Sequence, residues 1–161
     1  MKKKIVDLAE MARIAKKMRE AGKKLVATNG CFDLLHVGHV RYLQAARNLG
    51  DALAVGLNGD GSVCDLKGPG RPINNENDRA EVLAALECVD FVVIFPEIRA
   101  TRFLETVAPQ IYVKGGDYRS DTLDAEEQSV LKKAGAEIRL IPFEAGYSTS
   151  ATIKQLKSHL K

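Results

Sequence analysis

Short apolar segments alternate with longer amphipathic ones along the whole chain of 161 residues, and this alternation restricts the fold more than any other feature. The apolar segments are the expected strands, at residues 24–28, 52–57, 89–95, 110–113 and 137–143. The amphipathic segments are the expected helices, at residues 7–20, 37–49, 76–87, 99–107, 124–134 and 151–160. Continuous apolar strands between helices are typical of a parallel sheet covered on both faces. The pattern therefore predicts one α/β domain, 1–161, with an N-terminal helix at about 7–21 and a core at about 24–161.

Composition narrows the range of partners. The formal charge is +3, from 24 basic and 21 acidic residues, and aromatic residues make up only 6% of the chain, so nucleic-acid binding is not expected. No apolar run approaches the roughly 20 residues that span a bilayer, and the basic N-terminus lacks an apolar signal core. We therefore expect a cytoplasmic protein with no membrane partner. Three cysteines without a C-x-x-C spacing predict neither a disulfide framework nor a zinc site.

One connection is unusually long. Residues 58–75, "NGDGSVCDLKGPGRPINN", contain four glycines and two prolines and are expected to form a functional or mobile loop. Lys67 and Arg71 lie in this segment and could bring positive charge over a polyphosphate. The alternative is that both are simply solvated.

Three polar motifs follow expected strands: "NGCFDLLHVGH" at 29–39, "KGGDY" at 114–118 and "GYSTS" at 146–150. In an open parallel sheet, ligands bind beyond the carboxyl ends of the strands, where the strand order reverses. A Rossmann-like order of 3-2-1-4-5 makes the first and fourth strands neighbours at that point. The three motifs would then surround a single crevice.

Within the first motif, His36 and His39 flank Gly38 at the start of an expected helix. Three interpretations compete: metal ligands, a general base with a partner, or donors to an anion. Free backbone N–H groups and the helix dipole attract anions there, and Gly38 permits a close approach. A metal site would need a third protein ligand, and H-x-x-x-H is the usual helical spacing. The pattern favours the anion interpretation.

Three consecutive hydroxyls, Ser148, Thr149 and Ser150, precede the last expected helix. One of them is expected to be its N-cap, but three exceed what a cap needs, and with Gly146 they indicate a second phosphate site. Asp33 is either a helix cap or an acceptor for a substrate hydroxyl. The chain contains no G-x-x-x-x-G-K-[ST], no G-x-G-x-x-G after the first strand and no G-x-S-x-G. Two helix starts and a basic loop suit a nucleoside triphosphate held without a P-loop.

At this level of detail the chain resembles a known family. "GCFDLLHVGH" resembles the first signature of the HxGH nucleotidyltransferase superfamily, and "GYSTSATI" resembles its second, Ser/Thr-rich signature. "TNGCFDLLHVGHVRYLQAARNLGD", "LKGPGRPIN", "VKGGDY" and "FEAGYSTSATI", in this order, are similar to the adenylyltransferase domain of bacterial ADP-heptose synthases. The likeness covers nearly the whole chain. The likeness does not include the sugar-kinase half that many relatives carry, which implies a stand-alone form. The sequence reads "STS" where many relatives read "STT", and the hydroxyl is retained.

The resemblance implies transfer of AMP from ATP to heptose 1-phosphate, giving ADP-heptose and pyrophosphate for lipopolysaccharide or other surface polysaccharide. It implies in-line attack without a covalent enzyme intermediate, Mg²⁺ bridging the phosphates with no protein ligand, and a homodimer. The implied catalytic residues are His36, His39 and Lys67. The implied nucleotide and phosphate ligands are Gly30, Cys31, Phe32, Gly38, Arg71, Arg79, Gly116, Asp117, Ser148, Thr149 and Ser150. The candidates for the sugar phosphate are Asn29 and Asp33.

Some roles within that set stay open. Backbone N–H groups of 30–32 would face the phosphates, Ser148 to Ser150 would hold the β,γ end, and Asp117 would lie near the nucleoside. Arg79 could equally pack against the sheet. The rival activities are those of a glycerol-3-phosphate cytidylyltransferase or a flavin adenylyltransferase of the same superfamily. A rival from another class is a non-catalytic nucleotide-binding module.

Overall fold

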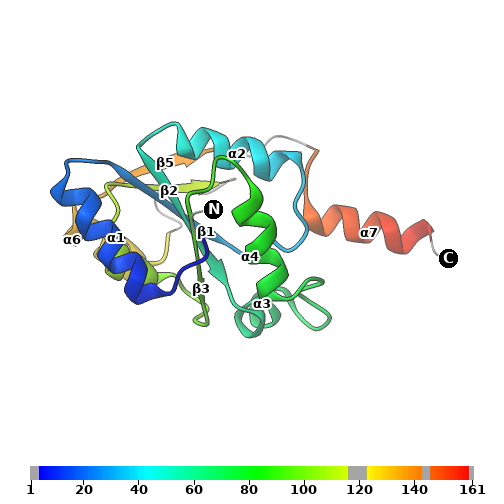
Figure 1. Cartoon of the computed structure of the whole chain (residues 1–161). Coiled ribbons are helices and arrows are strands. Elements are labelled where there is room, and N and C mark those ends of the chain that lie inside the picture. Colours follow the sequence, from blue (N-terminus) through cyan, green and yellow to red (C-terminus); the bar gives the residue numbers. More distant parts are fainter. Residues whose placement is uncertain (1–3, 116–122, 143–145, 160–161) are drawn as a thin grey trace.

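The computed structural model describes residues 4–115, 123–142 and 146–159. Five strands form one parallel sheet in the order β3-β2-β1-β4-β5, as the sequence predicts (Figure 1). The strands are β1 (Leu25–Gly30), β2 (Ala52–Asn58), β3 (Phe91–Phe95), β4 (Ile111–Gly115) and β5 (Glu137–Ile141). The helices are α1 (Leu8–Glu20), α2 (Val37–Arg47), α3 (Asp60–Lys67), α4 (Glu76–Ala85), α5 (Thr101–Val107), α6 (Ala125–Ala134) and α7 (Thr149–His159).

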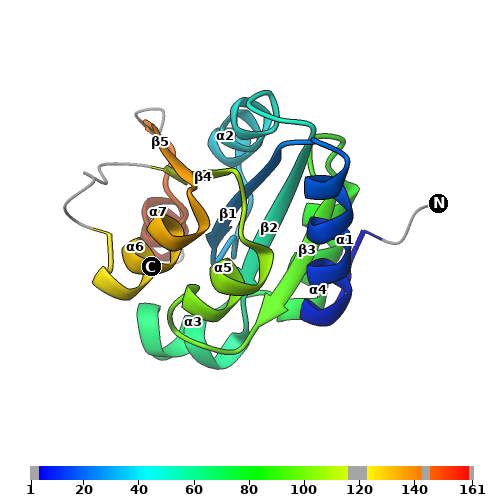
Figure 2. The same ribbon diagram turned by 90° about the vertical axis from the view of Figure 1, so that its left-hand side faces the viewer.

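Helices cover both faces of the sheet and divide the apolar core into two layers (Figure 2). On one face, α1, α5 and α6 bury residues such as Met11, Phe103 and Leu131. On the other face, α2 and α4 bury residues such as Leu43 and Leu83. Because side chains alternate along a strand, each strand contributes to both layers. This arrangement confirms the expected Rossmann-like α/β architecture.

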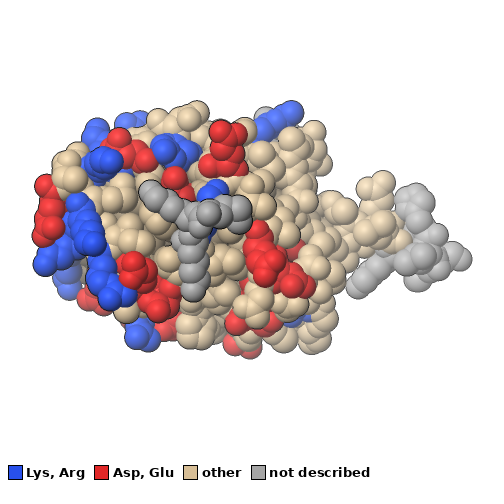
Figure 3. All heavy atoms as spheres, viewed as in Figure 1, with Lys and Arg blue, Asp and Glu red and all other residues tan. Residues whose placement is uncertain are grey.

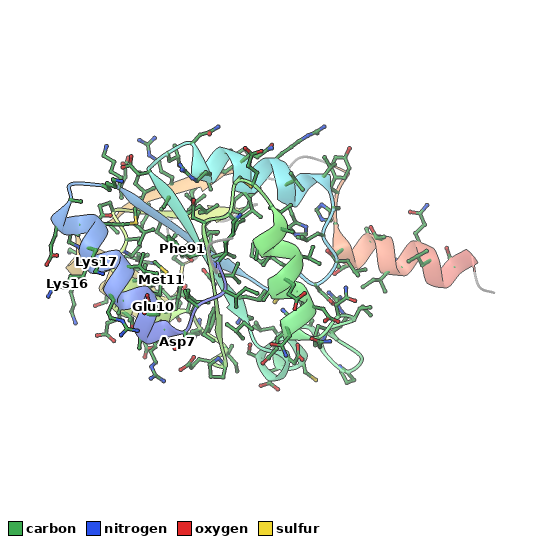
Figure 4. The ribbon with its side chains drawn as sticks, viewed as in Figure 1. Asp7, Glu10, Met11, Lys16, Lys17 and Phe91 are labelled. Atoms are coloured by element: carbon green, nitrogen blue, oxygen red, sulfur yellow. The ribbon has the colours of Figure 1, made fainter. Side chains whose placement is uncertain are left out.

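Helix α1 shows how the sequence pattern specifies a covering helix. Asp7 caps its N-terminus by accepting a hydrogen bond from the backbone N–H of Glu10 at 2.7 Å. Met11 points toward the sheet and is fully buried in the layer that Phe91 also contacts, whereas Lys16 and Lys17 face solvent (Figure 4). Charges of both signs lie side by side over this part of the surface (Figure 3).

The segment 58–75 contains a helix, which corrects the expectation of one long loop. Helix α3 begins after Gly59, and Asn58 supports it from the end of β2 by donating to the hydroxyl of Ser62 at 3.2 Å. Val63 is fully buried beneath the helix. Glycines obscure this element in the sequence because their helix propensity is low, and burial of one apolar side chain supplies what propensity lacks.

Helix α7 extends away from the body of the molecule (Figure 1). Exposed side chains along it include Lys154, Gln155 and Leu156. Its first turn, in contrast, is attached to the body through Thr149. None of the helices in residues 4–115, 123–142 and 146–159 is long and apolar enough to cross a bilayer.

Candidate active site

A pocket of about 560 Å³ opens at the carboxyl ends of the strands. It brings the two motifs of greatest interest together, because His36 and His39 line it along with Ser148, Thr149 and Ser150. The expected single crevice is therefore present. The other predicted residues that line the pocket are Asn29, Gly30, Cys31, Phe32, Asp33, Lys67 and Arg71.

The two imidazoles lie against each other at the start of α2. Their ring centroids are 3.9 Å apart and the rings are close to parallel. Nδ1 of His39 accepts a long hydrogen bond, 3.4 Å, from the backbone N–H of His36, which leaves the ring proton on Nε2. Among the described residues, Nδ1 of His36 is buried with no hydrogen-bond partner.

Both histidines are held in the neutral form. Burial lowers the pKa of His36, and burial together with the neighbouring His36 lowers the pKa of His39 to about 4. A neutral imidazole keeps one N–H donor, so each ring can donate a hydrogen bond to an anion. A pKa of about 4 also makes the ring of His39 a weak base near neutral pH, which favours donation to a phosphate over general-base chemistry.

Gly38 is the contact point between the two motifs. A Cβ atom there would lie 3.1 Å from ring atoms of His36 and 3.2 Å from the Cβ of Tyr147, closer than ordinary packing allows. The rings of His36 and Tyr147 are themselves 6.0 Å apart. The absent side chain of Gly38 thus permits the start of α7 to approach the imidazoles.

The three hydroxyls have different tasks. Ser148 accepts a hydrogen bond from the backbone N–H of Ala151 at 3.3 Å, as an N-cap does. Thr149 donates to the carbonyl of Leu34 at 2.9 Å and fastens α7 to the first motif. Ser150 is exposed at the pocket. Two of the three hydroxyls therefore also build the site that they line.

The turn after β1 places its backbone at the pocket. Phe32 adopts a φ of 43°, in the left-handed region, and a Cβ on Gly30 would lie 3.0 Å from its ring. Burial raises the pKa of the Cys31 thiol, although Lys67 and other nearby cations oppose the shift, so a reactive thiolate is not favoured there.

Asp33 anchors a neighbouring loop, which differs from the sugar-binding role expected for it. It forms an ion pair with Arg71 at 2.7 Å and accepts hydrogen bonds from the backbone N–H groups of Ile73 and Asn74. Burial alone would raise the pKa of Asp33, but these hydrogen bonds outweigh it and lower the pKa. Since both carboxylate oxygens already accept, the structure favours anchoring over contact with a substrate hydroxyl.

Arg79 has a structural task, which favours the packing role that the sequence leaves open for it over that of a phosphate ligand. It is 2% exposed and is not part of the pocket lining. Its guanidinium donates to the carbonyls of Cys31 at 2.6 Å, Asn58 at 2.9 Å and Asn74 at 3.0 Å, and to the carboxylate of Asp60 at 2.6 Å. These contacts join the turn after β1, the end of β2 and the start of α3.

The other predicted residues are placed as follows. Lys67 is the last residue of α3, is exposed and lines the pocket, so it stands on a helix end. Arg71 lines the pocket while paired with Asp33. Gly116 and Asp117 lie outside the described residues.

A second group of polar residues surrounds Asn29, which the sequence predicts as a site residue, but the other members of the group were not among the predicted site residues. Lys114 at the end of β4 donates to the hydroxyl of Tyr112 at 3.3 Å, and that hydroxyl donates to Oδ1 of Asn29 at 2.5 Å. Asp124, the N-cap of α6, and Glu127 of α6 also line the pocket. A lysine inside the apolar run "IYVKG" is the signal that could have identified this group.

A doubly wound sheet with a helix N-terminus and paired imidazoles at its carboxyl edge is typical of an α/β protein that binds an anionic ligand at that edge. More specifically, the chain belongs to the cytidylyltransferase-like family, whose model matches residues 27–156. This membership agrees with the resemblance to the HxGH superfamily of nucleotidyltransferases.

Relatives and solved structures agree with this assignment. The chain is 51% identical over 155 residues to the bifunctional protein HldE of Geotalea uraniireducens and 47% identical over 157 residues to that of Aliarcobacter butzleri. These matches cover 96% and 98% of this chain but 31% and 32% of the relatives, so the chain spans about a third of their length. The chain is also similar to the lipopolysaccharide core biosynthesis protein from Thermoplasma volcanium, of which a crystal structure is known. The two sequences are 31% identical, and the two structures superpose with a TM-score of 0.63 over 76% of this chain and 98% of that one.

Proposed function

We propose that this protein transfers AMP from ATP to D-glycero-D-manno-heptose 1-phosphate, producing ADP-heptose and pyrophosphate for surface polysaccharide. One observation carries the proposal: the imidazoles of the first motif and the hydroxyls of the second line one pocket. The similarity to bifunctional HldE proteins along 96% of the chain supports adenylyl transfer to a heptose phosphate.

The pocket suits a reaction that needs positioning and charge neutralisation. A phosphate oxygen of the sugar phosphate forms a bond to the α-phosphorus of ATP, and the bond to the β-phosphate oxygen breaks to release pyrophosphate. The sugar phosphate is already anionic near neutral pH, so no strong base is required. Charge builds on the oxygens of the α-phosphate in the transition state. These oxygens accept hydrogen bonds from Nε2–H of His39, the ring of His36 and the N-terminus of α2. Lys67 and Arg71 supply positive charge at the same pocket.

A divalent cation, proposed to be Mg²⁺, fits the site as a phosphate-bound ion. Within residues 4–115, 123–142 and 146–159, no group of three or more His, Cys, Asp or Glu side chains is arranged to hold a metal. Asp33, the acidic residue of the first motif, has both oxygens engaged. The ion would therefore be held by phosphate oxygens and would neutralise their charge.

Pyrophosphate release tests the proposal. The protein is incubated with Mg²⁺ and either ATP or CTP, and with heptose 1-phosphate, glycerol 3-phosphate or flavin mononucleotide as acceptor. We expect turnover only with ATP and heptose 1-phosphate. Turnover with CTP and glycerol 3-phosphate, or with ATP and the flavin, would assign the chain to a sister activity. Nucleotide binding without turnover of any pair would indicate a non-catalytic module.

The homodimer implied by the family resemblance also stays a prediction. Sedimentation equilibrium of the purified chain distinguishes a dimer, at twice the chain mass of 17.6 kDa, from a monomer.

A further inference from the structure

The polar residues of the pocket lie on two sides of the sheet. Tyr112 belongs to the core layer under α1, α5 and α6, and Ile111 and Val113 belong to the opposite layer. Lys114, the next residue of the strand, therefore lies on the same side as Tyr112, because side chains alternate. The imidazoles stand at the start of α2, on the opposite side.

Asn29 shares the Lys114 side of the sheet. Ala27 of β1 is opposite Tyr112 of β4 and belongs to the same core layer, and Asn29 is two residues further along its strand. The hydroxyl of Tyr112 joins Asn29 to Lys114 by two hydrogen bonds. Because Oδ1 of Asn29 accepts from Tyr112, this asparagine offers its amide N–H₂ group to the pocket.

We propose that Lys114 and Asn29 bind the phosphate of the acceptor sugar, while Tyr112 positions both. This inference rests on the proposed function and names the residues that determine acceptor binding. An ammonium and an amide N–H₂ both donate to phosphate oxygens. The reaction requires two phosphate-bearing substrates, and the triphosphate is assigned to the imidazoles and α7. The donors on the other side of the sheet edge then take the second phosphate.

The surroundings of Lys114 strengthen its interaction with an anion. Burial lowers the pKa of Lys114, whereas the nearby carboxylate of Glu127 opposes that shift. Glu127 is itself 6% exposed and accepts from the backbone N–H of Ala100 at 2.9 Å, so its position is fixed by α5. A partly dehydrated ammonium interacts with a phosphate more strongly than an exposed one does.

Steady-state kinetics of Lys114→Met test the inference. We expect the KM for heptose 1-phosphate to rise on the order of 10- to 100-fold, the loss expected for one charge-assisted hydrogen bond, with the KM for ATP within about twofold of wild type. Tyr112→Phe should also raise the acceptor KM, by less, because the charge of Lys114 remains. Lys132→Met, on the exposed side of α6, is the matched control and should change neither constant.

The outcomes separate this inference from the proposed function. If the wild-type protein does not use heptose 1-phosphate, the proposed function fails. If it does, but Lys114→Met leaves the acceptor KM unchanged or raises the ATP KM equally, the assignment of Lys114 is wrong. Should Lys114→Met fold poorly, as judged by circular dichroism, Lys114→Gln and Lys114→Arg replace it. The glutamine variant should then show the rise in acceptor KM, and the arginine variant should recover part of it.

Discussion

Replacing the buried guanidinium of Arg79 gives a decisive test of its structural role. Arg79→Met keeps an aliphatic side chain but removes donors to three backbone carbonyls and to Asp60. Breaking a buried ion pair by removing one partner costs about 3–5 kcal/mol. The carboxylate of Asp60 is 41% exposed and can be rehydrated, so we expect about 3 kcal/mol, with most of the loss at the carbonyls.

Urea denaturation followed by circular dichroism measures this loss. A destabilisation of about 3 kcal/mol in a chain of this size corresponds to a decrease in Tm on the order of 10 °C. Arg102→Met is the matched control, because Arg102 is 71% exposed and pairs with an exposed carboxylate, an arrangement worth about 0–1 kcal/mol. If Arg79→Met unfolds within about 1 kcal/mol of wild type and instead weakens ATP binding, Arg79 is a substrate ligand and the structural interpretation is wrong.

Three further predictions concern the two motifs. His39→Ala should lower kcat on the order of 100- to 1000-fold, about 3–4 kcal/mol of transition-state stabilisation, with a smaller change in ATP affinity. An unchanged rate constant in single-turnover assays would remove His39 from the mechanism. Gly38→Ala should reduce kcat and destabilise the fold by about 1–3 kcal/mol, because the new Cβ meets His36 and Tyr147. An activity assay measures the first effect and urea titration the second. Between pH 6.5 and 4 the unfolded chain binds a proton at His39 that the folded chain does not. The free energy of unfolding, measured by urea titration, should therefore fall as the pH is lowered through this window, and it should fall less steeply in His39→Asn.

The sequence predicts that the two motifs meet, because their meeting depends on the order of the strands in the sheet. Parallel strands place their carboxyl ends at one edge, and an order of 3-2-1-4-5 leaves only the fourth strand between the first, which His36 follows, and the fifth, which Ser148 follows. His36 and Ser148, 112 residues apart in the chain, can therefore be assigned to one pocket without knowledge of any contact.

What the sequence does not predict depends on specific contacts at long range. Arg79 reaches the carbonyl of Cys31 across 48 residues, and no local pattern distinguishes that contact from a phosphate contact. Helix α3 depends on burial of Val63 beneath it, which outweighs the glycines around it. Lys114 did leave a signal, a charged residue at the end of an apolar strand, but its partners Tyr112 and Asn29 follow only from the register of β1 and β4.

The anchored loop after α3 changes how positive charge reaches the pocket. The sequence leaves two roles open for Lys67 and Arg71: to bring charge over a phosphate on a mobile loop, or to be simply solvated. In the structure Lys67 is the last residue of α3, and Arg71 pairs with Asp33. Ordering long side chains on binding costs about 0.5–1.5 kcal/mol for each one immobilised. The buried carboxylate of Asp33 has already imposed that order on the side chain of Arg71 during folding, and α3 has ordered the backbone from which Lys67 extends. In the proposed reaction, Asp33 would contribute to phosphate binding by preorganising Arg71, and this role makes a buried acid compatible with a pocket for phosphates.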